Sequence, residues 1–145
     1  MNITFKKATS GDLELIIGIV SGAGLPTYDI TAAKLERFII ACEGEKPIGC
    51  AGFEISGKDA LLRSLAVTEE ARNNGLGKKL TGEIERICRG LGVREIYLLT
   101  KTAPKYFPSL GYRLITREET SEEIEKLTQF TDTSPHEATC MAKKL

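Results

Sequence analysis

Three cations and two glycines lie close together near the middle of the chain, in the run RNNGLGKK. An apolar segment precedes this run, and a pattern typical of a helix follows it. Glycines let an anion approach the backbone closely, and the first N–H groups of a helix have no intrahelical partner and carry partial positive charge. Arg72, Lys78 and Lys79 add charged donors. These residues indicate a phosphate site, although they leave open a simple turn followed by solvated lysines.

A strand and a helix must hold this run in place. The segment Ala60–Val67 is short and almost continuously apolar, as in a strand buried on both faces. Two familiar phosphate motifs, GxxxxGK[ST] and GxGxxG, are both incomplete here. After the glycines, apolar residues recur at spacings of three and four, which predicts an amphipathic helix with Leu76, Leu80, Ile84, Ile87 and Leu91 on its apolar face.

The rest of the sequence predicts an alternation of strands and helices. A first helix is expected after Ser10 as its N-cap, and a short second one with Thr31 as its cap. This order fits a mixed sheet with helices on both faces. The other expected strands are 2–8, 38–43, 47–56, 95–100, 111–117 and 137–143, with further helical segments at 103–110 and, as a turn or short helix, at 121–127.

Length and composition indicate one ordinary globular domain. The chain has 145 residues, of which 41% are hydrophobic and 28% charged, so we expect a single domain over 1–145. Lys plus Arg equals Asp plus Glu at 20 each, which argues against a nucleic-acid or polybasic membrane binder. No apolar run reaches the length of a membrane span, and the first residues lack a secretory core. We therefore expect a cytoplasmic protein.

The four cysteines are far apart and form no CxxC pair. Each stands in an apolar context, which favours buried thiols over disulfides or a metal site. The sequence therefore predicts no metal. The cysteines are Cys42, Cys50, Cys88 and Cys140.

The central run resembles a known family. RNNGLG matches the R/Q-x-x-G-x-G/A signature of the GNAT superfamily of acyl-CoA-dependent N-acetyltransferases, and LAV before it resembles that superfamily's acetyl-CoA strand. A later strand and APKYFPSLGY extend the resemblance over nearly the whole chain. LLRSLAV, YLLTKTA and SPHEATCMAKKL most resemble the small acetyltransferases of arsenic-resistance operons, akin to arsinothricin N-acetyltransferases. The implied fold is a mixed, mostly antiparallel sheet, splayed at its middle strands, with helices on both faces.

The resemblance implies acetyl-CoA as co-substrate. The backbone of Leu65, Ala66 and Val67 would hydrogen-bond the acetyl-pantetheine arm, and the Thr100 hydroxyl, at a place where the family often has asparagine, would contact the same arm. The pyrophosphate would be held by the signature residues, namely Arg72, Asn73, Asn74, Gly75, Leu76, Gly77 and Lys78.

The departing thiolate needs a proton, and the family's usual donor is missing. The frame A-x-x-x-Y-x-x-x-G-F fits at Ala103, Gly111 and Tyr112, but Phe107 stands at the tyrosine's place beside the cofactor. Tyr106 is one residue earlier, about 100° round a helix. Either Tyr106 reaches the sulfur through a local shift, or no side-chain acid is used; a packing or substrate role for Tyr106 is also open.

Arg63 interrupts the apolar strand, where strand alternation predicts that it shares a face with Leu65 and Val67. A buried arginine is costly unless it is paired. It is therefore either one half of a structural ion pair, with a carboxylate such as Glu54, or a clamp for an acidic group of the substrate, to which the guanidinium fork is suited.

Two further residues are candidates for the acceptor side. His136 is the only histidine and precedes the last strand, so it is either the base for the substrate's ammonium or a solvated loop residue. Tyr28 stands in the loop that lines the acceptor site in the superfamily.

The leading hypothesis is direct acetyl transfer, in a ternary complex, to the primary amine of a small molecule, such as an amino-acid-like acceptor with an acidic group. The alternatives are a catalytically silent acyl-CoA-binding module, favoured by Phe107, and an acetyltransferase of protein N-termini or lysines. Expected partners are a small-molecule amine, with no nucleic acid and no membrane; homodimer formation stays open.

Overall fold

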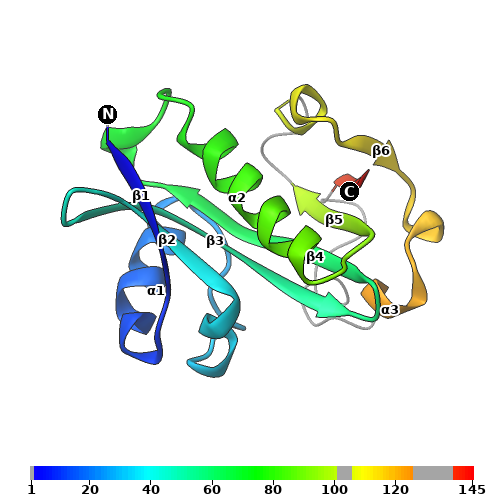
Figure 1. Ribbon diagram of the computed structural model, residues 1–145, viewed down its shortest axis with the longest axis horizontal. Helices are drawn as coiled ribbons and strands as arrows, with labels where there is room; N and C mark the ends of the chain where they lie inside the picture. Colours follow the sequence, from blue (N-terminus) through cyan, green and yellow to red (C-terminus); the bar gives the residue numbers. More distant parts are fainter. Residues whose placement is uncertain (1, 101–105, 126–138) are drawn as a thin grey trace. The chain divides into compact units, whose positions relative to one another are not determined.

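The computed structural model describes residues 2–100, 106–125 and 139–145, which form a seven-stranded sheet of order β1-β2-β3-β4-β5-β7-β6 (Figure 1). Within these ranges no helix is long and apolar enough to cross a membrane. The strands are β1 (Ile3–Lys7), β2 (Phe38–Glu43), β3 (Lys46–Ser56), β4 (Asp59–Val67), β5 (Glu95–Thr100), β6 (Arg113–Ile115) and β7 (Thr139–Lys144). The α-helices are α1 (Leu13–Gly22), α2 (Leu76–Gly90) and α3 (Glu122–Glu125), and the 3-10 segments are η1 (Ser10–Asp12), η2 (Ala33–Arg37), η3 (Glu69–Ala71), η4 (Phe107–Leu110) and η5 (Arg117–Glu119).

The chain divides into two compact units, which are described separately. The first unit comprises Met1–Phe53 and Ser64–Ile84, and the second comprises Glu54–Arg63 and Glu85–Leu145. The chain passes from one unit to the other within β3, β4 and α2, so each of these elements contributes to both units.

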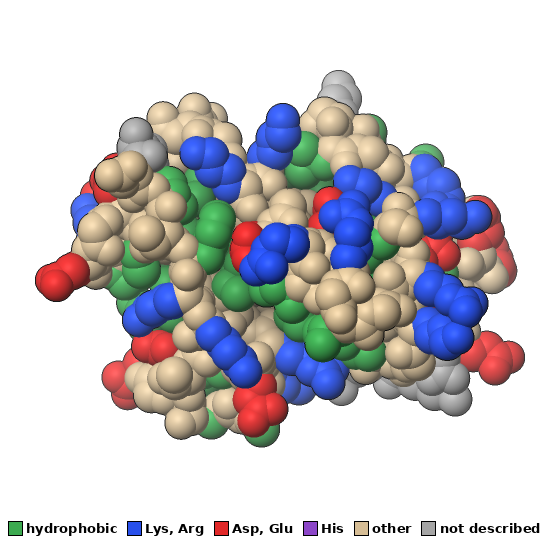
Figure 2. Space-filling view, in the orientation of Figure 1, with side chains coloured by type: hydrophobic (Ala, Val, Ile, Leu, Met, Phe, Trp, Pro, Cys, Tyr) green, Lys and Arg blue, Asp and Glu red, His purple; other side chains and the backbone are tan. Residues whose placement is uncertain are grey.

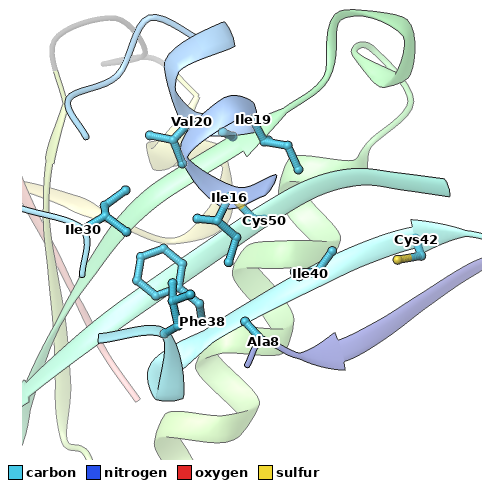
Figure 3. Close-up of a cluster of buried hydrophobic side chains, with 11 residues drawn as sticks. Ala8, Ile16, Ile19, Val20, Ile30, Phe38, Ile40, Cys42 and Cys50 are labelled. Atoms are coloured by element: carbon cyan, nitrogen blue, oxygen red, sulfur yellow. The ribbon is translucent and has the colours of Figure 1, made fainter. Parts of the chain in front are cut away.

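In the first unit, β1, β2 and β3 pair antiparallel, with a register shift in β2 between Ala41 and Cys42. Helices cover both faces of these strands. On one face, Phe38 and Cys50 pack with Ile16 of α1 in an apolar cluster (Figure 3). On the other face lies Gly49, where a Cβ would be 3.1 Å from a methyl group of Leu80 in α2. Because neighbouring strand residues point to opposite faces, α1 and the first half of α2 lie on opposite sides.

In the second unit, β4 and β5 pair in parallel, at Asp59–Leu61 with Glu95–Tyr97. The remaining pairs, β5 with β7 and β7 with β6, are antiparallel. Leu61, Tyr97 and Cys140 pack with Ile124 of α3 in a second apolar cluster. The predicted mixed, mostly antiparallel sheet with helices is therefore confirmed.

Local details of the predicted helices differ from the structure. The first helical segment is capped by Thr9 rather than Ser10, because Thr9 forms a capping box with Asp12, whose Oδ2 accepts from the Thr9 N–H at 2.8 Å. The cap of η2 is Ala32, not Thr31, and the segment is a 3-10 helix. Leu91 is exposed because α2 ends at Gly90, and the buried stripe continues through Cys88 instead.

The predicted state of the cysteines is confirmed, since all four are buried free thiols. Burial raises the pKa of Cys50 to about 12, and its Sγ lies 3.6 Å from the carbonyl oxygen of Ser64. This thiol therefore stays protonated at neutral pH and acts as a packing residue.

Candidate active site

The signature run forms a loop in the first unit between η3 and α2. Two of its residues have left-handed backbone conformations, Asn73 at φ 67° and Gly75 at φ 76°. The N–H of Lys79 donates to the carbonyl of Gly75 at 3.2 Å. The backbone N–H groups from Gly75 to Lys78 therefore precede the first hydrogen bond of the helix and have no carbonyl partner within it.

This loop is accessible and carries no opposing charge. All of its residues except the buried Leu76 are partly or fully exposed, and a Cβ at Gly75 would meet nothing within 4 Å. The first turn of α2 contains no acidic residue, and Figure 2, which shows the molecule from the side of α2, has several Lys and Arg side chains over this helix. Beside the loop, the Thr68 Oγ1 atom is buried and has no partner among the described residues. The arrangement fits a pyrophosphate held by backbone N–H groups.

Two polar side chains of the loop, Arg72 and Asn74, donate hydrogen bonds to backbone carbonyls. Arg72 donates from Nε to the carbonyl of Val67 at 3.1 Å and from Nη2 to the carbonyl of Gly22 at 3.5 Å. The Asn74 amide lies 3.4 Å from the carbonyls of both Ala71 and Arg72. These contacts join the ends of β4 and α1 to the loop, and direct contact of Arg72 or Asn74 with a phosphate stays a prediction.

The strand β4 is irregular at its centre. Ser64 has φ 54°, a conformation that is uncommon for a residue with a side chain. Such a residue interrupts the alternation of side chains along a strand. Simple alternation therefore no longer supports the expectation that Arg63 shares a face with Leu65 and Val67, which stays a prediction.

The structure shows a partner for Arg63. Its Nη1 lies 2.9 Å from Oε2 of Glu54, with 0% of the Arg63 side chain and 17% of the Glu54 side chain exposed. The structural ion pair considered from the sequence is thus present. A contact between Arg63 and an acidic substrate stays a prediction.

The aromatic residues around η4 belong to the second unit and pack as a series. The rings of Tyr106 and Phe107 are 5.1 Å apart, and those of Phe107 and Tyr112 are 5.7 Å apart, both edge to face. Phe107 and Tyr112 are buried, whereas 37% of Tyr106 is exposed. Burial raises the pKa of Tyr106, which keeps its phenol in the protonated form that an acid requires.

The other predicted site residues belong to separate elements or lie outside the described residues. Thr100 is buried at the end of β5, and Tyr28 is exposed in the segment after α1. His136 and Ala103 lie outside the described residues. In the part of the chain that is described, no group of three or more His, Cys, Asp or Glu is placed to hold a metal ion.

Sequence reasoning missed two residues near η4, Glu85 and Lys143. Glu85 of α2 is buried and accepts hydrogen bonds from Tyr112 and Lys143. One signal was available, since Glu85 follows Ile84 directly and so borders the apolar stripe of the helix. The sequence contains no comparable sign that Lys143, in the last strand, reaches this carboxylate.

Comparison with known proteins identifies the class. The model of the acetyltransferase (GNAT) family matches residues 20–112, so the chain belongs to this family. It is 35% identical to an uncharacterized N-acetyltransferase of Chlorobaculum tepidum over 85 residues, which cover 58% of this chain and 54% of that protein. It is 31% identical to an amino-acid acetyltransferase of Pseudomonas aeruginosa over 87 residues, 59% of this chain and 20% of that protein. The match thus spans about half of the first relative and a fifth of the second.

Solved structures support the fold. The chain is similar to N-acetylglutamate synthase from Neisseria gonorrhoeae, complexed with coenzyme A and N-acetyl-glutamate, with a TM-score of 0.87 and 18% identity over 100% of this chain and 35% of that one. A Mycobacterium tuberculosis protein in complex with CoA has a TM-score of 0.82 and 17% identity over 98% of this chain and 99% of that one. At these identities the likeness concerns the fold alone.

Proposed function

We propose that this chain is an acetyl-CoA-dependent N-acetyltransferase that acetylates the primary amine of a small molecule by direct transfer. The observation that carries the proposal is the exposed loop before α2, with its left-handed Gly75 and its uncommitted helix N-terminus. A pyrophosphate bound there would anchor coenzyme A. Membership of the acetyltransferase family supports the same activity. We further propose that residues 1–145 form one acetyltransferase domain.

The reaction itself needs few side chains. The neutral amine attacks the thioester carbonyl carbon, an N–C bond forms, the C–S bond breaks, and the amine's excess proton is passed on while the thiolate leaves. The backbone of Leu65–Val67 would hold the thioester arm, and His136 would take the proton of the ammonium. Tyr106, kept protonated by burial, would supply the thiolate's proton; coenzyme A thiolate is also a tolerable leaving group without it.

For the acceptor we propose an amino acid or a related molecule with an acidic group. The supporting facts are the buried guanidinium of Arg63 and the names of relatives, which include an amino-acid acetyltransferase and an N-acetylglutamate synthase. The narrower resemblance to acetyltransferases of arsenic-resistance operons makes arsinothricin a specific candidate. Tyr28 would line the entrance for such an acceptor.

Thiol release from acetyl-CoA tests the activity over a panel of amines. The panel contains L-glutamate, L-glutamine, arsinothricin, each acid's amide, a lysine-containing peptide and a free peptide N-terminus. We expect turnover with small amino acids and a loss of roughly tenfold or more in kcat/KM when the acidic group is amidated. Turnover only with the peptides would instead favour a protein acetyltransferase.

Calorimetry tests the binding step separately. Acetyl-CoA should bind more tightly than S-acetylpantetheine, which lacks the pyrophosphate, and Arg72→Ala should cost about 1.5–3 kcal/mol if its guanidinium contacts the phosphate. Tight binding without turnover of any amine would favour the silent acyl-CoA-binding module. Equal affinity for both thioesters would exclude the loop as a pyrophosphate site.

A further inference from the structure

A buried polar network lies beside η4 in the second unit. At its centre is the carboxylate of Glu85, on α2, with 6% of the residue exposed. The Tyr112 hydroxyl donates to Glu85 Oε2 at 3.0 Å, and Lys143 Nζ lies 3.1 and 3.2 Å from the two carboxylate oxygens. Arg89 approaches the same carboxylate at 4.0 Å. The Glu85 carboxylate thus has three side-chain partners, of which Lys143 and Arg89 are cationic.

Lys143 makes a further contact, with the backbone of the turn. Its Nζ donates to the carbonyl of Leu110, the last residue of η4, at 2.9 Å. The next residue, Gly111, has φ 95°, and a Cβ there would be 3.2 Å from Lys143 Cε. Only a glycine combines this backbone conformation with so close an approach. The close contact between Lys143 and the turn therefore depends on the glycine at position 111.

The same turn carries the aromatic series. The amide N–H groups of Gly111 and Tyr112 donate to the carbonyls of Pro108 and Phe107, which closes the turn. The Phe107 ring packs against Tyr112, and the Tyr106 ring packs against Phe107. A shift of the Leu110 carbonyl would thus be passed to both Phe107 and Tyr106.

We infer that Lys143, with Glu85 as its counter-ion, is a positioning residue for η4 and sets the orientation of Tyr106 and Phe107. The inference rests on the proposed function for the statement that this orientation matters to catalysis. A buried ion pair is a poor source of stability, since apolar residues of similar size often replace one without loss. What an apolar pair would not supply is the hydrogen bond to Leu110.

A set of four variants separates positioning from stability. Lys143→Met removes the ammonium but keeps the stem, Glu85→Leu removes the carboxylate, and the double variant removes both charges. Lys144→Met, at the exposed neighbouring residue of β7, is the matched control. The single variants should lower Tm because each leaves a charge without its ion-pair partner, the buried Glu85 carboxylate or the partly buried Lys143 ammonium, and the double variant should recover much of that loss.

The decisive readout is kcat in the double variant. We expect it to stay roughly 10- to 100-fold below wild type although Tm recovers, with the affinity for acetyl-CoA unchanged, because the Leu110 carbonyl still lacks its donor. The control should match wild type in every measurement. Recovery of kcat together with Tm would overturn the inference and assign the network to stability alone.

Hydrogen exchange provides a test that does not depend on activity. In Lys143→Met and in the double variant, the amides of Gly111 and Tyr112 should exchange about tenfold faster or more, whereas those of the control should not change. Unchanged exchange would overturn the positioning role even if kcat fell. If the wild type released no thiol with any amine, the proposed function would fail, and the exchange data would still decide whether Lys143 orders the turn.

Discussion

The loop before α2 and the turn around η4 are held in place by different kinds of contact. In the loop, the groups offered to a ligand are backbone N–H groups, and the charged side chains around them are exposed. At the turn around η4, the buried carboxylate of Glu85 and the partly buried ammonium of Lys143 hold the backbone through side-chain contacts. The structure of the loop depends on backbone conformation, whereas that of the turn around η4 depends on the identity of side chains far apart in the sequence.

This difference predicts different responses to mutation. The backbone groups of the loop survive most substitutions, so that only a change in backbone conformation should disturb them. Buried charges are sensitive to the loss of either partner, because the remaining charge is left in an apolar environment. Four changes test the comparison, beginning with the one of largest expected effect.

Arg63→Leu should be the most damaging. The variant removes the guanidinium that lies 2.9 Å from the Glu54 carboxylate, which is 17% exposed, and we expect the free energy of unfolding to fall by about 3 kcal/mol in urea titrations. Affinity for acetyl-CoA should be retained in the folded fraction. Arg63→Lys keeps the charge and loses the bidentate geometry. Loss of discrimination between an acid and its amide, with stability unchanged in the lysine variant, would assign Arg63 to the substrate.

Tyr106→Phe tests whether the turn around η4 supplies the acid. If Tyr106 is the acid, kcat should fall about 100-fold with little change in acetyl-CoA affinity. An acid is active while protonated, and burial raises the pKa of Tyr106, so the alkaline loss of kcat should lie above tyrosine's ordinary value of about 10. A nearly wild-type rate would mean that water protonates the thiolate.

Gly75→Val tests the dependence of the loop on backbone conformation. Space is not limiting, since a Cβ at Gly75 meets nothing within 4 Å, but a β-branched residue at φ 76° costs about 1–2 kcal/mol. We expect roughly tenfold weaker binding of acetyl-CoA by calorimetry. Gly75→Asn is the matched control, because asparagine tolerates this conformation. Equal affinities of the two variants would show that the left-handed conformation is not what the ligand requires.

Lys46→Met should have the smallest effect. The Lys46–Glu70 pair of the first unit is exposed, with 60% and 73% of the side chains accessible. Hydrogen bonding to Lys46 lowers the pKa of Glu70, so any stability from the pair would be present above the ordinary carboxylate pKa and lost as the pH falls through the lowered value. Because solvent screens the pair, Tm should not change measurably between the variant and wild type at neutral pH or at pH 3. A clear shift in Tm would contradict the expected difference in stability between this exposed pair and the Arg63–Glu54 pair.

The features that the sequence predicted well are local. The strands at Phe38–Glu43 and Glu95–Thr100 agree at both ends, and the helix after Gly75 begins where the glycines indicated. The loop before α2 could be predicted for the same reason, since glycine spacing and a helix start are properties of neighbouring residues. The Arg63–Glu54 pair could also be predicted, because the two residues are nine positions apart on strands joined by a tight turn.

What the tertiary structure alone decided depends on distant contacts and on backbone torsions. The left-handed conformation of Ser64 is not favoured by its residue type, and it could not be predicted from the simple alternation assumed for β4. Lys143 and Glu85 are 58 residues apart, so no periodicity relates them. Hydrophobic pattern and glycine spacing act over a few residues and can be recognised in the sequence. The placement of buried charges depends on which strands become neighbours, and it is fixed only when the chain folds.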